Sequence, residues 1–188
     1  MATQAVSTPY DPAQVARYHS VSRALHWLMA ALILGNAVGG ILHNAAPALI
    51  MPIHKSTGIL ILTLAAIRLG WRLLYPPPPH PPQVTRMEKS LAGVIHTILY
   101  ALMFLVPLSG WMYASSGPAP LTFYGLFDIP KFAISRGDPL ANIAGEGHEL
   151  MAFLLLGLAV GHVGAAMYHH FIKNDPTLVR MTGRGLRR

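Results

Sequence analysis

The chain of 188 residues contains no cysteine. Disulfides, zinc sites built from thiolates and iron–sulfur clusters are excluded, because each of them needs a cysteine sulfur. Charge is scarce as well: Asp, Glu, Lys and Arg make up 11% of the residues, against about 25% in a typical soluble domain. That is too little charge to cover a water-soluble globule of this size, so we expect a protein that lies in a membrane.

Hydrophobic residues make up 53% of the chain and gather in four stretches. The stretches cover about residues 24–42, 53–74, 91–114 and 148–171. Each is close to the roughly 20 helical residues that cross a bilayer core about 30 Å thick. None alternates as a barrel strand does, so the sequence predicts an all-α integral membrane protein, a four-helix bundle. The first stretch is longer than the apolar region of a signal peptide, and we expect it to be retained.

The apolar stretches define the predicted organisation of the chain. We expect a polar lead over 1–22, a transmembrane domain over 23–173 and a basic tail over 174–188. The prolines between positions 76 and 82 must end the second helix and form a stiff connection. The longest loop, about 115–147, is rich in Gly and Pro, and we expect a short helix in it near Phe132.

The 14 Lys and Arg residues are divided unequally between the two predicted sides of the membrane. Eleven lie on the side of the termini and the proline-rich connection: Arg17, Arg23, Arg68, Arg72, Arg86, Lys89, Lys173, Arg180, Arg184, Arg187 and Arg188. The other three are Lys55, Lys131 and Arg136. Basic residues concentrate in cytoplasmic loops, so both termini are expected in the cytoplasm. The net charge of +7 therefore indicates membrane lipid rather than nucleic acid as a partner.

Histidines provide the strongest functional signal. Six of the ten lie in or beside the apolar stretches: His26, His54, His96, His148, His162 and His169. Ionisable side chains inside a membrane are unfavourable and usually functional. Because successive helices run in opposite directions, His54 and His148 are expected near the outer face. The same reasoning places His26 and His162 in the cytoplasmic half.

The spacing on the last predicted helix adds a second constraint. His148 and His162 are fourteen residues apart, which is about 21 Å along the axis and within about 40° in direction. One helix face therefore presents two imidazoles at two depths. Haem iron accepts two neutral imidazoles as axial ligands, so the pattern predicts two b-type haems. The predicted ligand pairs are His54 with His148 and His26 with His162.

Other polar residues at the cytoplasmic depth have several possible roles. His96 could replace a ligand of the inner pair, or it could bind a haem propionate or a quinone carbonyl. His169, seven residues after His162, could bind the same groups. Arg68 and Arg72 share a helix face and could pair with haem propionates, as arginine forks suit carboxylates, or extend to the cytoplasmic interface.

Short motifs follow one another in a fixed order along the chain. They are ALHWL at 24–28, IHKSTG at 53–58, RLGWR at 68–72 with YP at 75–76, IH at 95–96 with PLSG at 107–110, GHE at 147–149, GH at 161–162 and YHHFIKND at 168–175. In this combination, over about residues 17–182, the chain resembles the bacterial cytochrome b561 family.

The resemblance implies a four-helix protein of the bacterial inner membrane that holds two haem b groups. It also implies that His26 pairs with His162 and that His54 pairs with His148. Stand-alone members resemble superoxide oxidases, which take electrons from superoxide at the periplasmic face and pass them to ubiquinone. Lys55, next to His54, is the candidate for attracting superoxide, although that side carries three basic and four acidic residues.

Two other functions compete with this hypothesis. The chain could be an electron carrier that docks to a periplasmic dehydrogenase or hydrogenase and has no small-molecule substrate of its own. It could also be a histidine-based metal or proton transporter, although transport sites usually gather near the midplane of the membrane. Glycines four apart, at 35 and 39 and at 157 and 161, fit a homodimer as well as packing within the chain.

Overall fold

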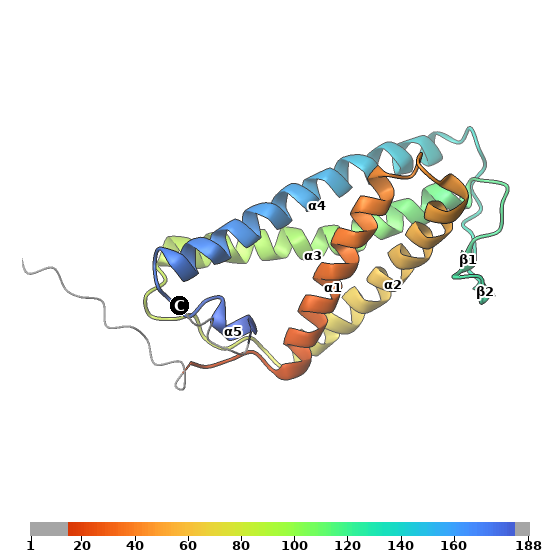
Figure 1. The fold of residues 1–188 in the computed structure, drawn as a ribbon. Coiled ribbons are helices and arrows are strands. Elements are labelled where there is room, and N and C mark those ends of the chain that lie inside the picture. Colours follow the sequence, from red (N-terminus) through yellow and green to blue (C-terminus); the bar gives the residue numbers. More distant parts are fainter. Residues whose placement is uncertain (1–14, 183–188) are drawn as a thin grey trace, which may run out of the picture.

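Four long helices make up most of the computed structural model, which describes residues 15–182 (Figure 1). They are α1 (Ser20–Ile41), α2 (Pro47–Leu74), α3 (Arg86–Ser115) and α4 (Pro139–Phe171). Each is long and apolar enough to cross a membrane, which confirms the predicted all-α bundle. Residues 1–14 of the predicted lead and 183–188 of the predicted tail lie outside the described part of the chain.

All four helices begin earlier than their apolar stretches do, because residues before each stretch favour the start of a helix. In α3, Thr85 and Glu88 form a capping box, in which each side chain satisfies a backbone N–H of the other residue. Both α2 and α4 begin with a proline, whose missing N–H is not needed in the first turn. As a result, His148 lies more than two turns inside α4 rather than at its start.

The helices pack in an order that leaves one side of the bundle open. The α2 helix packs against α1 and α3, and α3 also packs against α4, whereas α1 and α4 have few contacts with each other. A small core of Met29, Ile61, Ala65 and Met103 joins the first three helices. In Figure 1, α1 and α4 diverge from one end of the bundle toward the other.

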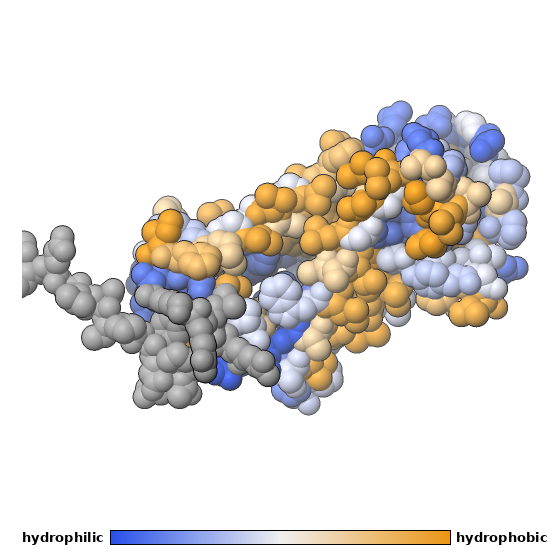
Figure 2. All heavy atoms as spheres, viewed as in Figure 1, coloured by the Kyte–Doolittle hydropathy of each residue, from blue (hydrophilic) through white to orange (hydrophobic). Residues whose placement is uncertain are grey.

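Most of the apolar surface faces outward. Large side chains such as Leu73, Leu150 and Val160 are mainly exposed. Figure 2 shows hydrophobic atoms along the length of the bundle, while hydrophilic atoms gather mostly at its two ends. This distribution matches a bilayer, in which apolar side chains contact lipid and polar ones contact water.

A β-hairpin closes one end of the bundle, which we call the hairpin end. Its strands are β1 (Thr122–Phe123) and β2 (Phe127–Asp128), which pair antiparallel. The backbone N–H of Tyr124 donates to Ser56 Oγ at 2.9 Å, and the Tyr124 hydroxyl lies 2.8 Å from Thr57 Oγ1. Ser56 and Thr57 are both buried, so the hairpin is fixed to α2 two and three residues after His54.

The expected short helix near Phe132 is wrong. The segment after the hairpin is irregular, and the Phe132 ring packs on Trp111 with centroids 5.0 Å apart. The indole N–H of Trp111 donates to the carbonyl of Pro130 at 2.9 Å. These tertiary contacts hold the segment against α3 in an extended path, so it does not form a helix of its own.

The opposite end, which we call the proline end, carries the proline-rich connection and both ends of the described chain (Figure 1). Residues 172–182, which we call the C-terminal strap, fold back across this end and include the short helix α5 (Val179–Thr182). The guanidinium of Arg180 donates to the carbonyls of Ala16, Pro78 and Pro79 at 3.1, 2.7 and 2.8 Å. Arg180 thus joins three segments that are far apart in the sequence.

Two further contacts hold the strap. The Trp27 indole N–H donates to the carbonyl of Met181 at 3.1 Å. Lys173 Nζ lies 2.6 Å from a carboxylate oxygen of Glu88 in the first turn of α3, and this contact raises the pKa of Lys173. The strap is therefore attached to α1, to α3 and to the proline-rich connection.

We predict that Arg180→Ala destabilises the protein by about 2 kcal/mol or more, since hydrogen bonds from a charged donor are stronger than neutral ones. The midpoint of thermal unfolding in detergent should fall by at least about 4 °C. Arg86→Ala, which removes an exposed arginine at the start of α3, is the control and should leave the midpoint unchanged. Equal midpoints for both variants would contradict a locking role for Arg180.

Candidate functional site

The histidines meet in two pairs, and each pair joins α4 to an earlier helix. The ring centroids of His26 in α1 and His162 in α4 are 6.2 Å apart. Those of His54 in α2 and His148 in α4 are 6.0 Å apart. A metal–nitrogen bond is about 2 Å long, so two imidazoles on opposite sides of one metal have centroids roughly 6 Å apart. Both pairs have the spacing of two axial ligands.

Backbone carbonyls orient both histidines of the pair near the hairpin end. Nδ1 of His54 donates to the carbonyl of Asn36 at 3.0 Å, and Nδ1 of His148 donates to the carbonyl of Val106 at 2.8 Å. A carbonyl can only accept, so Nδ1 carries the hydrogen in each ring. The lone pair is therefore on Nε2, the tautomer that binds a metal through Nε2.

Two glycines leave room for these rings. A Cβ atom on Gly40 of α1 would lie 3.0 Å from Cε1 of His54. On Gly110 of α3, it would lie 2.8 Å from both Cε1 and Nδ1 of His148. Any side chain at position 110 would therefore push His148 out of its place, and position 40 is nearly as tight.

The pair near the proline end is arranged differently. Nδ1 of His26 accepts a hydrogen bond from Nη2 of Arg68 at 3.0 Å, because a guanidinium can only donate. Arg68 also donates from Nε to the hydroxyl of Tyr100 at 3.1 Å. The neutral His26 ring thus carries its hydrogen on Nε2. Binding a metal through Nε2 requires Arg68 to leave Nδ1.

His96 makes this end a group of three imidazoles from three helices. Its ring centroid is 5.3 Å from that of His162, closer than the centroid of His26. That spacing is shorter than the span of two ligands on opposite sides of one metal, whereas His26 has that span. Within residues 15–182, no three His, Asp or Glu side chains form a metal-binding group by themselves.

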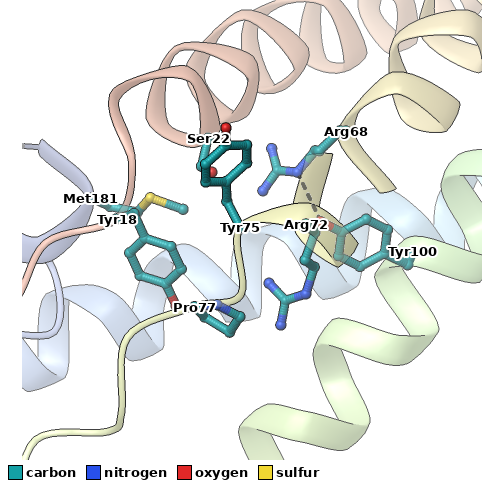
Figure 3. A pocket seen from close by; sticks show the side chains of 8 residues that line it. All are labelled: Tyr18, Ser22, Arg68, Arg72, Tyr75, Pro77, Tyr100 and Met181. Atoms are coloured by element: carbon teal, nitrogen blue, oxygen red, sulfur yellow. Dashed lines mark hydrogen bonds between the residues drawn. The ribbon is translucent and has the colours of Figure 1, made fainter. Parts of the chain in front are cut away.

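A small cationic pocket lies beside the His26 pair (Figure 3). Its lining residues are Tyr18, Ser22, Arg68, Arg72, Tyr75, Pro77, Tyr100 and Met181. The guanidinium carbons of Arg68 and Arg72 lie 5.8 and 5.6 Å from the centroid of the Tyr100 ring. No carboxylate of the described residues pairs with either arginine. The pocket therefore has two positive charges available for an anionic group.

An apolar groove borders the other pair. It lies between α1 and α2, has a volume of about 330 Å³ and includes His54, Asn36 and Thr57 among its lining residues. Lys55 is exposed next to His54 at the hairpin end. His169 lies at the far end of α4, where its Nδ1 contacts the carboxylate of Asp175.

Several residues of the site were not identified from the sequence. The carbonyls of Asn36 and Val106 leave no sequence signal, because every residue has a carbonyl. Gly110 is the last residue of the PLSG motif at 107–110. A glycine inside a membrane helix is a signal that another group approaches the helix backbone closely. Tyr100 and Asp175 were missed because their partners are known only after folding.

Comparisons with known proteins identify the family of the chain. Residues 17–184 match the family described as prokaryotic cytochrome b561. Cytochrome b561 homolog 2 of Escherichia coli (strain K12) is 34% identical over 178 residues, which cover 89% of this chain and 92% of that protein. The probable superoxide oxidase CybB of Yersinia pestis is 31% identical over 172 residues, which cover 88% of this chain and 95% of that protein. The chain therefore belongs to the prokaryotic cytochrome b561 family of electron-transfer membrane proteins.

Proposed function

We propose that the chain is a di-haem b-type cytochrome that moves electrons across the bacterial inner membrane, between a periplasmic donor and ubiquinone. The observation that carries this proposal is the pair of histidine couples, with centroids 6.2 and 6.0 Å apart, at two depths of one bundle. Haem b, which the family implies, supplies an iron that gains and loses one electron at a time.

His54 and His148 are suited to hold one haem. Their Nδ1 atoms are bound to carbonyls, their Nε2 atoms carry the lone pairs, and glycines leave space beside both rings. The few contacts between α1 and α4 leave the side of the bundle open where the couples lie. A six-coordinate iron suits electron transfer better than binding of oxygen to the metal.

His26 and His162 are proposed to hold the second haem. When Nε2 of His26 binds iron, its Nδ1 must carry the hydrogen, and the guanidinium of Arg68 must turn away. Arg68 and Arg72 then have no carboxylate partner among the described residues, and haem propionates would supply one. His96 is the neighbouring candidate for binding a propionate or a quinone carbonyl.

The excess of basic residues at the proline end supports a cytoplasmic position for that end and for both termini. The hairpin end is then periplasmic, so His54 and His148 lie nearest to the donor. Ubiquinone would be reduced near the proline end, where His96, His169, Arg68 and Arg72 are the candidates for contacting it.

Superoxide is the first candidate donor, because a relative is named a probable superoxide oxidase. Lys55 is exposed beside His54 and supplies local positive charge. The ammonium of Lys131, in contrast, contacts the carbonyls of Gly117 and Ala119. A docked donor protein is the second candidate, and the exposed side chains of Leu126 and Phe127 at the hairpin tip favour it.

We predict that His54→Ala and His162→Ala each lose one low-spin haem, because each removes one ligand from a different pair. Reduced-minus-oxidised absorption spectra, together with the haem-to-protein ratio, measure this directly. His43→Ala is the control, since this exposed histidine belongs to neither pair, and it should keep both haems. Two haems in both ligand variants would refute the assignment, and a colourless wild-type protein would refute the whole proposal.

Gly110→Ala should displace His148 and weaken the haem near the hairpin end, since the added methyl group would lie 2.8 Å from the imidazole. We expect the haem-to-protein ratio to fall from two toward one. Gly93→Ala is the matched control on the same helix, because a Cβ atom there meets nothing within 4 Å. If both variants retain their haem equally, Gly110 is not needed to position His148.

The donor can be tested with purified protein, a superoxide generator and ubiquinone. We expect superoxide-dependent reduction of the quinone, slowed roughly threefold by Lys55→Gln at low ionic strength and less at high ionic strength, because salt screens attraction of an anion. Arg136→Gln removes an exposed charge on the same side and should have a smaller effect. If the rate of quinone reduction does not depend on superoxide but rises when a donor protein is added, the chain is instead a carrier that docks to that donor.

A further inference from the structure

The C-terminal strap returns a carboxylate to the end of α4. The chain reverses direction at Asn174, whose φ of 54° lies in the left-handed region that asparagine tolerates. The N–H of Asp175 then donates to the carbonyl of His169 at 3.1 Å, and its carboxylate contacts Nδ1 of the same histidine. One residue therefore binds both the backbone and the side chain of His169.

Asp175 is fully buried, with 0% of its surface exposed. A buried carboxylate is unfavourable unless it is hydrogen-bonded or paired. Here Oδ1 accepts from the N–H of Thr177 at 2.9 Å, and Oδ2 contacts Nδ1 of His169. Lys173 and Arg180, the two cations of the strap, lie close enough to interact with its charge. These groups supply the hydrogen bonds and positive charge that a buried carboxylate needs at this position.

The contact fixes the tautomer of His169. Because an ionised carboxylate can only accept, the hydrogen is on Nδ1, and Nε2 carries the lone pair. The carboxylate also balances the charge of the ring whenever Nε2 takes up a proton. An imidazole held in this way can accept a proton at Nε2 and release it again without turning.

The position of His169 suits such a transfer. It follows His162 by seven residues on the same helix, which is about 10 Å along the axis and within about 20° in direction. Its side chain is 14% exposed, so it has access to water at the proline end. Neither histidine couple includes it, so its Nε2 is not needed as an axial ligand.

We propose that Asp175 is a positioning residue that holds His169 as the proton carrier for reduction of quinone at the proline end. The inference rests on the proposed function. Each quinone takes up two electrons, which come from the donor one at a time, and two protons, which come from water. Two O–H bonds form on the quinone oxygens, and each proton passes through Nε2 of His169.

The test separates electron transfer from proton transfer. Protein reduced with dithionite is mixed either with ubiquinone-1, which needs protons, or with ferricyanide, which takes an electron alone. We expect Asp175→Asn to slow reoxidation by the quinone at least about tenfold, while reoxidation by ferricyanide stays within about twofold. Glu88→Gln is the matched control, because it removes the carboxylate partner of Lys173 in the other ion pair of the strap and leaves Asp175, Lys173 and His169 in place.

A second variant distinguishes the loss of the proton carrier from a loss of folding. In His169→Ala, added imidazole should restore reoxidation by the quinone, with haem spectra unchanged. If Asp175→Asn slows reoxidation by both oxidants equally, or if Glu88→Gln slows reoxidation by the quinone as much as Asp175→Asn does, the role of Asp175 is structural and the inference fails. The inference also fails if Asp175→Asn and His169→Ala both react with the quinone at the wild-type rate. If wild-type protein reacts only with ferricyanide, the proposed quinone substrate is wrong as well.

Discussion

The arrangement of the site depends on hydrogen bonds between histidine rings and helix carbonyls inside an apolar bundle. An imidazole in lipid needs a partner for each polar nitrogen, and the carbonyls of Asn36 and Val106 satisfy Nδ1 of His54 and His148. These bonds leave the lone pair of each ring on Nε2, in two rings whose centroids are 6.0 Å apart. The two histidine rings have to reach the backbone of a neighbouring helix to make these hydrogen bonds. This explains the glycines at 40 and 110, where a side chain would collide with the rings.

The open side of the bundle is the second constraint. Helices α1 and α4 have few contacts, yet the two couples join α4 to α1 and α2. In a protein without a cofactor, such a gap would forfeit packing between these helices. Two features hold the helices on either side of this gap. One is the small core around Met29 and Ala65, and the other is the C-terminal strap, which Arg180 binds to the proline-rich connection. The bundle is therefore stabilised at its ends and along one side, which leaves the other side for the proposed haems.

The sequence predicted the number of helices, the family and the pairing of histidines by depth, because these follow from apolar length, helix rise and ordered motifs. It did not predict the early start of α4, since Asn142 and Glu146 interrupt the apolar residues that follow Pro139. The helix expected near Phe132 does not form, because packing of that ring against Trp111 overrides local preference. The bond between Arg68 and His26, and that between Asp175 and His169, join residues whose proximity arises only from packing or from a chain reversal.

The distribution of the couples over the helices has a consequence for biogenesis. Each couple takes one histidine from the first half of the chain and one from α4, the last of the long helices. A nascent chain with three inserted helices therefore contains neither couple, and the strap that closes the proline end is made later still. In the proposed di-haem cytochrome, haem could therefore be bound only after nearly the whole polypeptide has been translated, and products that stop before α4 would be colourless.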